Sequence, residues 1–202
     1  MGLTERSGAV DAAPVSDASK IVLVGGGVRS GKSAFALQRA RELGARRVFV
    51  ATGEALDQEM RARVTLHRAE RGPDFRTLEV PRELVAALSR VEAADVIVID
   101  CMTLWLSNLL LDGLSEAAIA ARVNDLCETL AQRRFHALIV TNEVGLGIVP
   151  ENALARRFRD VVGRAHQRLG QVADEVYFGV MGQLLRLKPS PIEAVLLRPA
   201  DA

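Results

Sequence analysis

The stretch KIVLVGGGVRSGKS, residues 20–33, decides the fold of this chain. Its second half, residues 26–33, has the spacing G-x-x-x-x-G-K-[ST] of a phosphate-binding loop, or P-loop. A short β-branched run comes before the glycines, and a run with helical spacing of apolar residues follows them, from 31 to 43. The stretch therefore predicts a buried strand, a phosphate-binding loop and a helix, in the order that this motif requires.

Each part of the loop has a chemical purpose. Glycines allow backbone N–H groups to turn inward around phosphate oxygens, and the amino end of the following helix also favours anions. Lys32 is placed to reach the β- and γ-phosphates, and the Ser33 hydroxyl is placed to bind Mg²⁺. Lys32 is also one of three lysines in a chain with 23 arginines, which weighs against a glycine-rich turn that precedes Lys-Ser by chance.

Apolar runs alternate with helical patterns along the rest of the chain. Strands are predicted at 47–51, 77–80, 95–100, 136–141, 176–181 and 184–187, and helices at 54–70, 81–92, 103–111, 115–133 and 151–169. The strand runs lack polar alternation, which is typical of strands that are buried on both faces. The pattern predicts an α/β fold, a three-layer α/β/α sandwich with a mainly parallel sheet.

Composition narrows the class of protein. The 202 residues carry 26 Lys and Arg against 25 Asp and Glu, a net charge of +1, which argues against a general binder of nucleic acid or membrane surfaces. Cys101 and Cys127 lack metal-ligand spacing and no apolar run is long enough to span a membrane, so we expect a reduced, cytoplasmic protein. Residues 1–19 predict a disordered tail, and residues 20–202 predict a single nucleotide-binding domain.

Two carboxylates follow predicted strands. Asp100 ends the apolar run 96–100, and we expect this strand to lie beside the first one, so that Asp100 can hold Mg²⁺ near the loop. The alternative for Asp100 is an ordinary polar residue at a strand end. Glu143 follows the strand that ends near Thr141, at the edge where such sheets bind ligands. For Glu143 a catalytic role and a role as a turn or helix cap remain equally open.

A histidine stands on the charged helix predicted at 54–70. Arg63, His67 and Arg71 share one face at spacings of four residues, and two flanking guanidinium groups disfavour protonation of His67. A neutral imidazole is a competent nucleophile toward phosphorus. Taken alone, however, the pattern favours an ordinary solvent-exposed histidine. We interpret the two other histidines, His136 and His166, as structural.

Longer motifs carry a resemblance to a known family. They are GGVRSGKS (26–33), VATG (50–53), DQEMRARV (57–64), HRAER (67–71), DFRTLEVP (74–81), VIVIDCMTLWLSNLL (96–110) and VTNEVGLGIVPENALARRFRDVVGRAHQRL (140–169). With these motifs the chain resembles the bifunctional adenosylcobinamide kinase/adenosylcobinamide-phosphate guanylyltransferases of cobalamin biosynthesis. The resemblance runs from about Ile21 to Lys188, with Phe75 standing where the family pattern leads us to expect Trp.

The resemblance implies a RecA-like P-loop fold and two reactions at one nucleotide site. In the first, ATP or GTP phosphorylates the terminal hydroxyl of adenosylcobinamide. In the second, His67, which matches the family histidine, attacks the α-phosphate of GTP and carries GMP as a phosphoramidate. Adenosylcobinamide phosphate then takes the GMP and leaves as adenosylcobinamide-GDP. The resemblance thus makes His67 catalytic, together with Lys32.

The resemblance also implies a set of site residues. The nucleotide-binding positions are Gly26, Gly27, Val28, Arg29, Ser30, Gly31, Lys32, Ser33, Ala51, Thr52, Gly53, Arg68, Ala69, Glu70, Arg71, Glu79 and Asp100. Ser33 and Asp100 are the expected ligands of Mg²⁺, and Glu79 is the expected acceptor for guanine N1–H and N2–H₂. The implied partners are GTP, ATP, adenosylcobinamide and its phosphate, within a homotrimer and without nucleic acid or membrane insertion.

If the P-loop is considered without the longer motifs, two other functions are possible. One is a kinase of another small molecule, in which His67 is a surface residue and no nucleotide becomes covalently attached. The other is a non-catalytic GTP-binding regulator.

Overall fold

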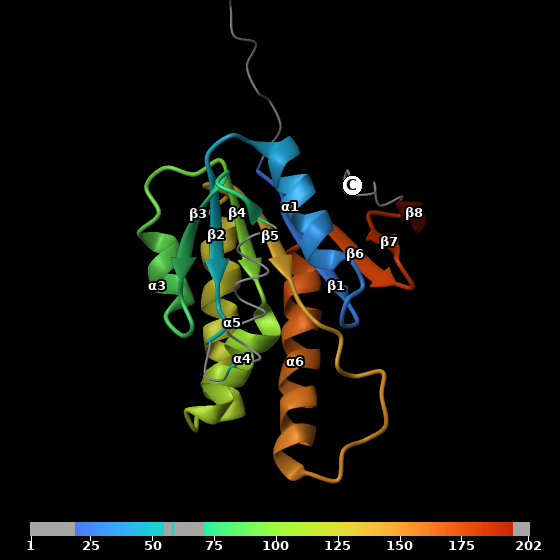
Figure 1. The fold of residues 1–202 in the computed structure, drawn as a ribbon. Coiled ribbons are helices and arrows are strands. Elements are labelled where there is room, and N and C mark those ends of the chain that lie inside the picture. Colours follow the sequence, from blue (N-terminus) through green and yellow to red (C-terminus); the bar gives the residue numbers. More distant parts are fainter. Residues whose placement is uncertain (1–18, 55–57, 59–70, 196–202) are drawn as a thin grey trace, which may run out of the picture.

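The fold is that of a computed structural model, which describes residues 19–54, 58 and 71–195 (Figure 1). Except for Ser19, the predicted tail 1–19 lies outside the described residues. The same is true of the predicted helix 54–70, apart from Glu54 and Gln58. Among the described residues, no helix is long and apolar enough to cross a membrane.

One eight-stranded sheet runs through the molecule, in the order β3-β2-β4-β5-β1-β6-β7-β8. Six strands are parallel, and β7 and β8 continue the sheet in antiparallel pairing. The mainly parallel sheet is as predicted, while β8 is a strand that the sequence patterns do not indicate. The strands are β1 (Ile21–Gly26), β2 (Arg47–Ala51), β3 (Phe75–Glu79), β4 (Val96–Asp100), β5 (His136–Val140), β6 (Glu175–Val180), β7 (Gln183–Lys188) and β8 (Glu193–Val195).

Helices cover both faces of the sheet, which gives the predicted three layers. Helix α1 (Lys32–Leu43) packs on one face (Figure 1). The other face is covered by α3 (Leu84–Ser89), α4 (Met102–Leu111), α5 (Glu116–Ala131) and α6 (Ala153–Val172). Helix α3 is shorter than the predicted 81–92, and α6 begins at Ala153 because the Asn152 side chain accepts hydrogen bonds from the backbone N–H groups of Leu154 and Ala155.

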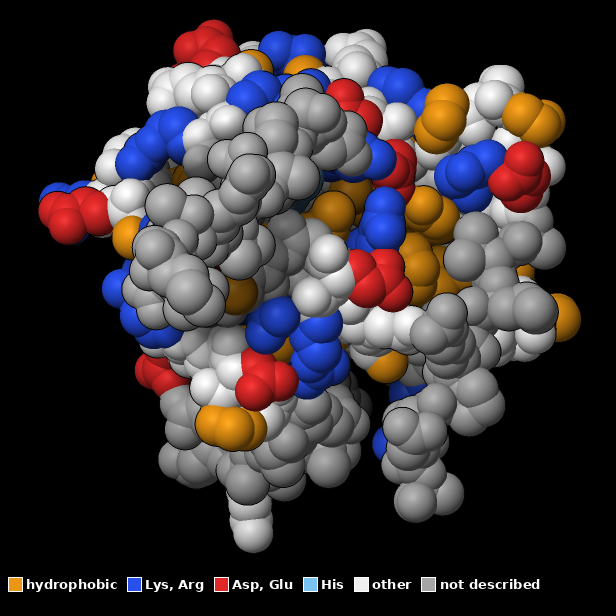
Figure 2. Space-filling view, turned by 90° about the horizontal axis from the view of Figure 1, so that it is seen from above, with side chains coloured by type: hydrophobic (Ala, Val, Ile, Leu, Met, Phe, Trp, Pro, Cys, Tyr) orange, Lys and Arg blue, Asp and Glu red, His pale blue; other side chains and the backbone are white. Residues whose placement is uncertain are grey.

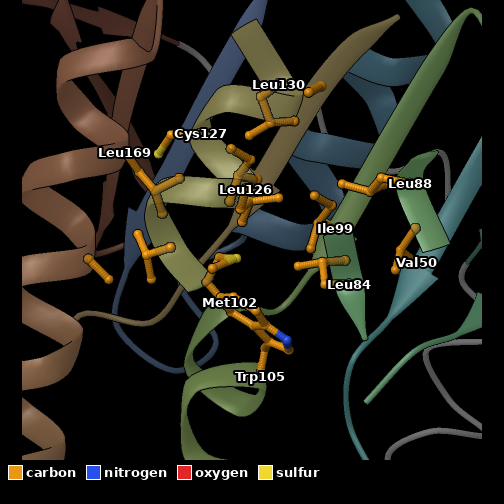
Figure 3. Packing of buried hydrophobic residues seen from close by; sticks show 14 of the residues in the cluster. Val50, Leu84, Leu88, Ile99, Met102, Trp105, Leu126, Cys127, Leu130 and Leu169 are labelled. Atoms are coloured by element: carbon orange, nitrogen blue, oxygen red, sulfur yellow. The ribbon is translucent and has the colours of Figure 1, made fainter. Parts of the chain in front are cut away.

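The strands alternate their side chains between two hydrophobic cores. On β1, Ile21 and Leu23 belong to the core under α3–α6, whereas Val22 and Val24 belong to the core under α1. Figure 3 shows the larger core, with Met102 and Trp105 of α4 among the side chains that fill it. Trp105, the single tryptophan of the chain, is 1% exposed and donates its indole N–H to the Arg82 carbonyl at 2.7 Å.

The position of β4 corrects one expectation. We expected the strand that ends in Asp100 to lie directly beside β1, but β5 lies between them. The chain leaves β4 through α4 and α5 and returns to insert β5 next to β1. With neighbouring strands about 4.8 Å apart, the backbones of β4 and β1 are separated by roughly 10 Å.

The amino ends of the strands are joined by paired charges. Arg46, just before β2, donates to Asp95, just before β4, at 2.9 Å from Nε to Oδ1. Arg133 and Asp174 form a similar pair before β5 and β6, and the Lys20 ammonium lies 3.2 Å from Glu175. Seen from above the view of Figure 1, Lys and Arg side chains lie beside Asp and Glu side chains at several places (Figure 2). This edge therefore presents interspersed charges of both signs.

Candidate functional site

The glycine-rich loop joins the carboxyl end of β1 to the start of α1. Gly26 has a φ of +147°, and a Cβ there would lie 2.4 Å from the Gly179 carbonyl oxygen of β6, so only glycine fits. Gly31, at φ 86°, caps α1 in the left-handed conformation. Ser30 is buried and lies between Gly26 and Gly179, and its Oγ has no hydrogen-bond partner in the part of the chain that the structure describes. The loop is thus packed tightly against β6.

Lys32 is the first residue of α1 and is only 7% exposed. Its Nζ donates to the Gly27 carbonyl oxygen at 2.9 Å, so the ammonium group is held across the loop. Burial lowers the pKa of Lys32, while the negative charge of Asp100 acts in the opposite direction. The carboxylate is therefore near enough to influence the ammonium, although their strands are not neighbours.

The carboxyl ends of the strands align Glu79 and Asp100 with Ala51. In the parallel register Glu79 pairs with Ala51, which pairs with Asp100. Asp100 is half-buried, whereas Glu79 is exposed at the end of the edge strand β3. Four strand spacings, roughly 19 Å, separate β3 from β1. Lys32, which follows β1, and Glu79 therefore lie far apart along the same edge.

Thr52 connects the ends of β2 and β4. Its Oγ1 donates to the Cys101 carbonyl oxygen at 2.7 Å and accepts from the Cys101 backbone N–H at 2.8 Å. Its own carbonyl accepts from the Asn108 side chain, and the residue is fully buried. Gly53 is half-buried, and a Cβ there would approach Leu104 to 3.0 Å. The Thr52 side chain thus fixes the backbone of this edge, and the predicted contact of Thr52 with nucleotide stays a prediction.

The segment after the predicted nucleophile is described only at Arg71. Its guanidinium lies 4.0 Å above the Phe49 ring of β2, and its carbonyl accepts from Arg41 of α1. The side chain is 4% exposed, so the structure places it against the sheet. The predicted site residues His67, Arg68, Ala69 and Glu70 lie outside the described residues.

A Mg²⁺ ion would find suitable ligands in Ser33 and Asp100. Ser33 is half-buried in the first turn of α1, and Asp100 is half-buried at the carboxyl end of β4. One carboxylate and one hydroxyl, completed by phosphate oxygens and water, is the donor set that proteins use for Mg²⁺ with nucleotides. The described residues hold no cluster of three or more His, Cys, Asp or Glu that could bind a metal by itself.

Residues at the carboxyl end of β5 form a part of the site that the sequence patterns only hint at. Asn142 donates to Thr103 Oγ1 at 3.1 Å, which ties β5 to the start of α4. Thr141 Oγ1 lies 2.7 Å from His166 Nε2 of α6, and His166 Nδ1 lies 3.5 Å from Glu143 Oε2. The sequence patterns led us to interpret His166 as structural, because its contact with Glu143 forms only when α6 packs beside β5. One sequence signal places His166 on the inward side of α6, namely its spacing of four residues from the buried Val162.

Large aliphatic side chains are exposed on the loops that follow β1, β5 and β6. Val28 is 77% exposed in the P-loop, Leu146 and Ile148 are 81% and 96% exposed after β5, and Met181 is 95% exposed after β6. Figure 1 shows the loop between β5 and α6 extending beyond the carboxyl ends of the strands. A separate hollow between α5 and α6 contains none of the predicted site residues.

Comparison with known proteins identifies the family. The family model "Cobinamide kinase / cobinamide phosphate guanyltransferase" matches residues 22–187. A bifunctional adenosylcobalamin biosynthesis protein CobP of Pseudomonas aeruginosa is 41% identical over 178 residues, which cover 84% of this chain and 98% of that protein. The CobU proteins of Salmonella typhimurium and Escherichia coli, with the same description, are 40% and 35% identical over 83% of this chain and 99% of theirs.

A solved structure resembles the fold. The RadB recombinase superposes with a TM-score of 0.52 at 13% identity, covering 87% of this chain and 86% of that one. At that identity the likeness concerns the fold alone, and it agrees with a RecA-like P-loop architecture. The P-loop geometry, this fold and the match over 22–187 together show that the chain is an enzyme that belongs to the cobinamide kinase/cobinamide phosphate guanyltransferase family of cobalamin biosynthesis.

Proposed function

We propose that the enzyme phosphorylates adenosylcobinamide with ATP or GTP and then transfers GMP from GTP to the product through a guanylyl-His67 intermediate. The final product is adenosylcobinamide-GDP. The observation that carries the proposal is the buried Lys32 ammonium, held across the P-loop within reach of the Asp100 charge. It stands inside a chain whose residues 22–187 match the family.

In the first reaction the terminal hydroxyl oxygen of the aminopropanol arm bonds to the γ-phosphorus. The bond from that phosphorus to the bridging oxygen breaks, and a nucleoside diphosphate leaves. Negative charge shifts over the phosphate oxygens during this transfer, and the loop N–H groups and Lys32 stabilise it. Lys32 Nζ is already directed into the loop by the Gly27 carbonyl, so it needs little rearrangement.

The second reaction forms and breaks a bond to His67. A neutral imidazole nitrogen attacks the α-phosphorus of GTP, pyrophosphate leaves, and the phosphate of adenosylcobinamide phosphate later displaces the histidine. The other two histidines support this assignment. His136 Nδ1 accepts from the Lys20 backbone N–H at the far edge of the sheet, and both ring nitrogens of His166 face partners.

Further parts of the proposal concern the nucleotide and its metal. A Mg²⁺ ion bound by Ser33, Asp100 and phosphate oxygens would neutralise phosphate charge. Gly26, Gly27, Val28, Arg29, Ser30 and Gly31 cradle the phosphates. The nucleotide is also contacted by Ala51, Thr52 and Gly53 and by Arg68, Ala69, Glu70 and Arg71. Glu79 at the exposed end of β3 accepts from guanine. The homotrimer implied by the family resemblance belongs to the same proposal.

The covalent intermediate gives the decisive experiment. Incubation with α-labelled GTP and Mg²⁺, followed by denaturation, should leave an acid-labile and alkali-stable label on the protein, as a phosphoramidate requires. His67→Ala should abolish the label. His136→Gln and His166→Gln are the matched controls, because they change the only other histidines of the chain, and both should retain it.

Two results would contradict the proposal. Label that persists in His67→Ala would exclude His67 as the carrier. A folded protein that binds GTP and phosphorylates a small molecule but never becomes labelled would be a kinase without the guanylyl step.

A further inference from the structure

Glu143 stands directly beside the start of the phosphate-binding loop. The Thr141 backbone N–H donates to the Val24 carbonyl, and the Glu143 backbone N–H donates to the Gly26 carbonyl, both at 3.0 Å. The segment after β5 therefore continues alongside β1 to the first glycine of the loop. This register brings the Glu143 carboxylate to the same edge as Lys32. Glu143 follows β5, whereas the predicted metal ligands Ser33 and Asp100 belong to α1 and β4.

Both oxygens of the Glu143 carboxylate have a partner that fixes their direction. Oε1 accepts from the Gly145 backbone N–H at 2.5 Å, and Oε2 lies 3.5 Å from His166 Nδ1. The side chain is 26% exposed, so solvent or a substrate reaches it from one side. Each carboxylate oxygen can accept two hydrogen bonds, which leaves acceptor capacity on both.

His166 is arranged to donate toward Glu143 from Nδ1. Burial lowers the pKa of His166, although Glu143 acts in the opposite direction, and a neutral ring carries a proton on one nitrogen only. The Thr141 hydroxyl, 2.7 Å from Nε2, can donate to that nitrogen, which leaves the ring proton on Nδ1 facing the carboxylate. The order Thr141, His166, Glu143 thus resembles the hydrogen-bonded chains that orient a catalytic base.

We propose that Glu143 is the general base of the kinase reaction and that His166 is a positioning residue for it. This inference rests on the proposed function. As the acceptor hydroxyl attacks the γ-phosphorus, its O–H bond breaks and the proton passes to Glu143. The new P–O bond forms while the bond to the departing diphosphate breaks. The carboxyl group later returns the proton to solvent, so no further reactant is needed.

The proposal separates the two reactions of the enzyme. Phosphorylation starts from a hydroxyl, which must lose a proton. Guanylyl transfer starts from an imidazole and then from a phosphate, which is already ionised at neutral pH. A base at Glu143 should therefore matter for phosphorylation and not for guanylyl transfer.

The test is Glu143→Gln, assayed for each reaction separately. With adenosylcobinamide, kcat for phosphorylation should fall by about 10²–10⁴-fold, the usual contribution of a general base. With α-labelled GTP, the variant should become labelled like the unchanged enzyme, and it should pass GMP to adenosylcobinamide phosphate supplied directly. Retained labelling also proves that the variant is folded and binds nucleotide.

Other outcomes overturn the inference in distinguishable ways. Unchanged phosphorylation excludes Glu143 as the base, and equal loss of both reactions makes it a structural residue of the nucleotide site. If Glu143→Gln does not fold, Glu143→Asp serves instead: the carboxylate is drawn back by one methylene group, so phosphorylation should fall while labelling is retained, and equal loss of both reactions would overturn the assignment. An unchanged enzyme that phosphorylates no cobinamide contradicts the proposed function itself, before any variant is considered.

A pair of substitutions tests the positioning role of His166. His166→Asn keeps a donor near the position of Nδ1, facing Glu143, whereas His166→Gln keeps one near Nε2, facing Thr141. We expect kcat for phosphorylation to be at least about tenfold higher in the Asn variant, with KM for the nucleotide alike in both. Equal kcat values in the two variants would refute a positioning role.

Discussion

At the amino ends of the strands, charged side chains pair with one another, whereas at the carboxyl ends the Lys32 ammonium is held by a backbone carbonyl oxygen of the P-loop. Asp95 before β4 accepts from Arg46 and from two backbone N–H groups, at Ala45 and Arg46. Asp100 at the other end of β4 shares its edge with Lys32, whose ammonium is held by a carbonyl. The comparison teaches that the same strands serve stability at one edge and chemistry at the other.

The largest effect is expected from removing the ammonium of the P-loop. Lys32→Ala should lower phosphorylation and guanylylation by at least about 10²–10³-fold each, because the charge that develops on the phosphates loses its partner. Lys20→Ala, at the amino edge, is the matched control and should change neither rate. Equal losses of rate in Lys32→Ala and Lys20→Ala would contradict the view that only the carboxyl edge takes part in the reactions.

A second pair of substitutions compares the two ends of β4. Asp100→Asn should lower both rates by roughly 10²-fold and raise the Mg²⁺ concentration needed for half-maximal rate, since a charged ligand of the ion is lost. Asp95→Asn should leave rates and Mg²⁺ dependence unchanged. An Asp100→Asn enzyme with an unaltered Mg²⁺ titration would remove Asp100 from the metal site.

The smallest effect concerns stability and its pH dependence. Hydrogen bonds from the Arg46 side chain and backbone lower the pKa of Asp95 to about 2, from an ordinary value of 3.8. A carboxyl with a lowered pKa stabilises the folded state above the unfolded pKa, and this contribution is lost as the pH falls from about 4 to 2. Asp95→Asn should therefore lower the unfolding midpoint at pH 7 by roughly 2–4 °C, and less at pH 2.

The buried Trp105 provides the measurement, because its emission shifts to the red when unfolding exposes the indole. A difference between the unchanged protein and Asp95→Asn that stays constant from pH 7 to pH 2 would show that the Asp95 charge does not contribute. Activity at neutral pH serves as the control and should be equal in the two proteins.

Local patterns predicted the loop and most strands because both depend on short stretches. The P-loop is specified by its own eight residues, and the central parallel strands β1, β2, β4 and β5 are mostly apolar runs with both faces buried. The order of the strands was not predictable in this way. The insertion of β5 between β1 and β4, which made the expected neighbourhood of Asp100 wrong, depends on where the chain returns after α5.

The same distinction applies to the site: short motifs predict some of its residues, and contacts between distant segments determine the others. Lys32 and Asp100 follow from motifs, whereas the contact of His166 with Thr141 and Glu143 joins α6 to β5 across more than twenty residues. The hydrogen bonds of the Thr52 side chain to Cys101 likewise join two segments that lie far apart in the sequence. The spacing from Val162 indicates the inward side of α6 for His166, but no spacing indicates which residues it or Thr52 contacts.

The scarcity of lysine makes the loop open to chemical footprinting. The three lysines lie at the amino end of β1, in the P-loop and at the end of β7, where Lys188 donates to the carbonyls of Gly170 and Gln171. Acylation of a lysine blocks cleavage by a lysine-specific protease, so each site yields its own missed cleavage. Bound nucleotide should lower the acylation of Lys32 and leave the acylation of Lys20 and Lys188 unchanged. A mass spectrum of the digest would then report whether the loop holds nucleotide, without an assay for either reaction.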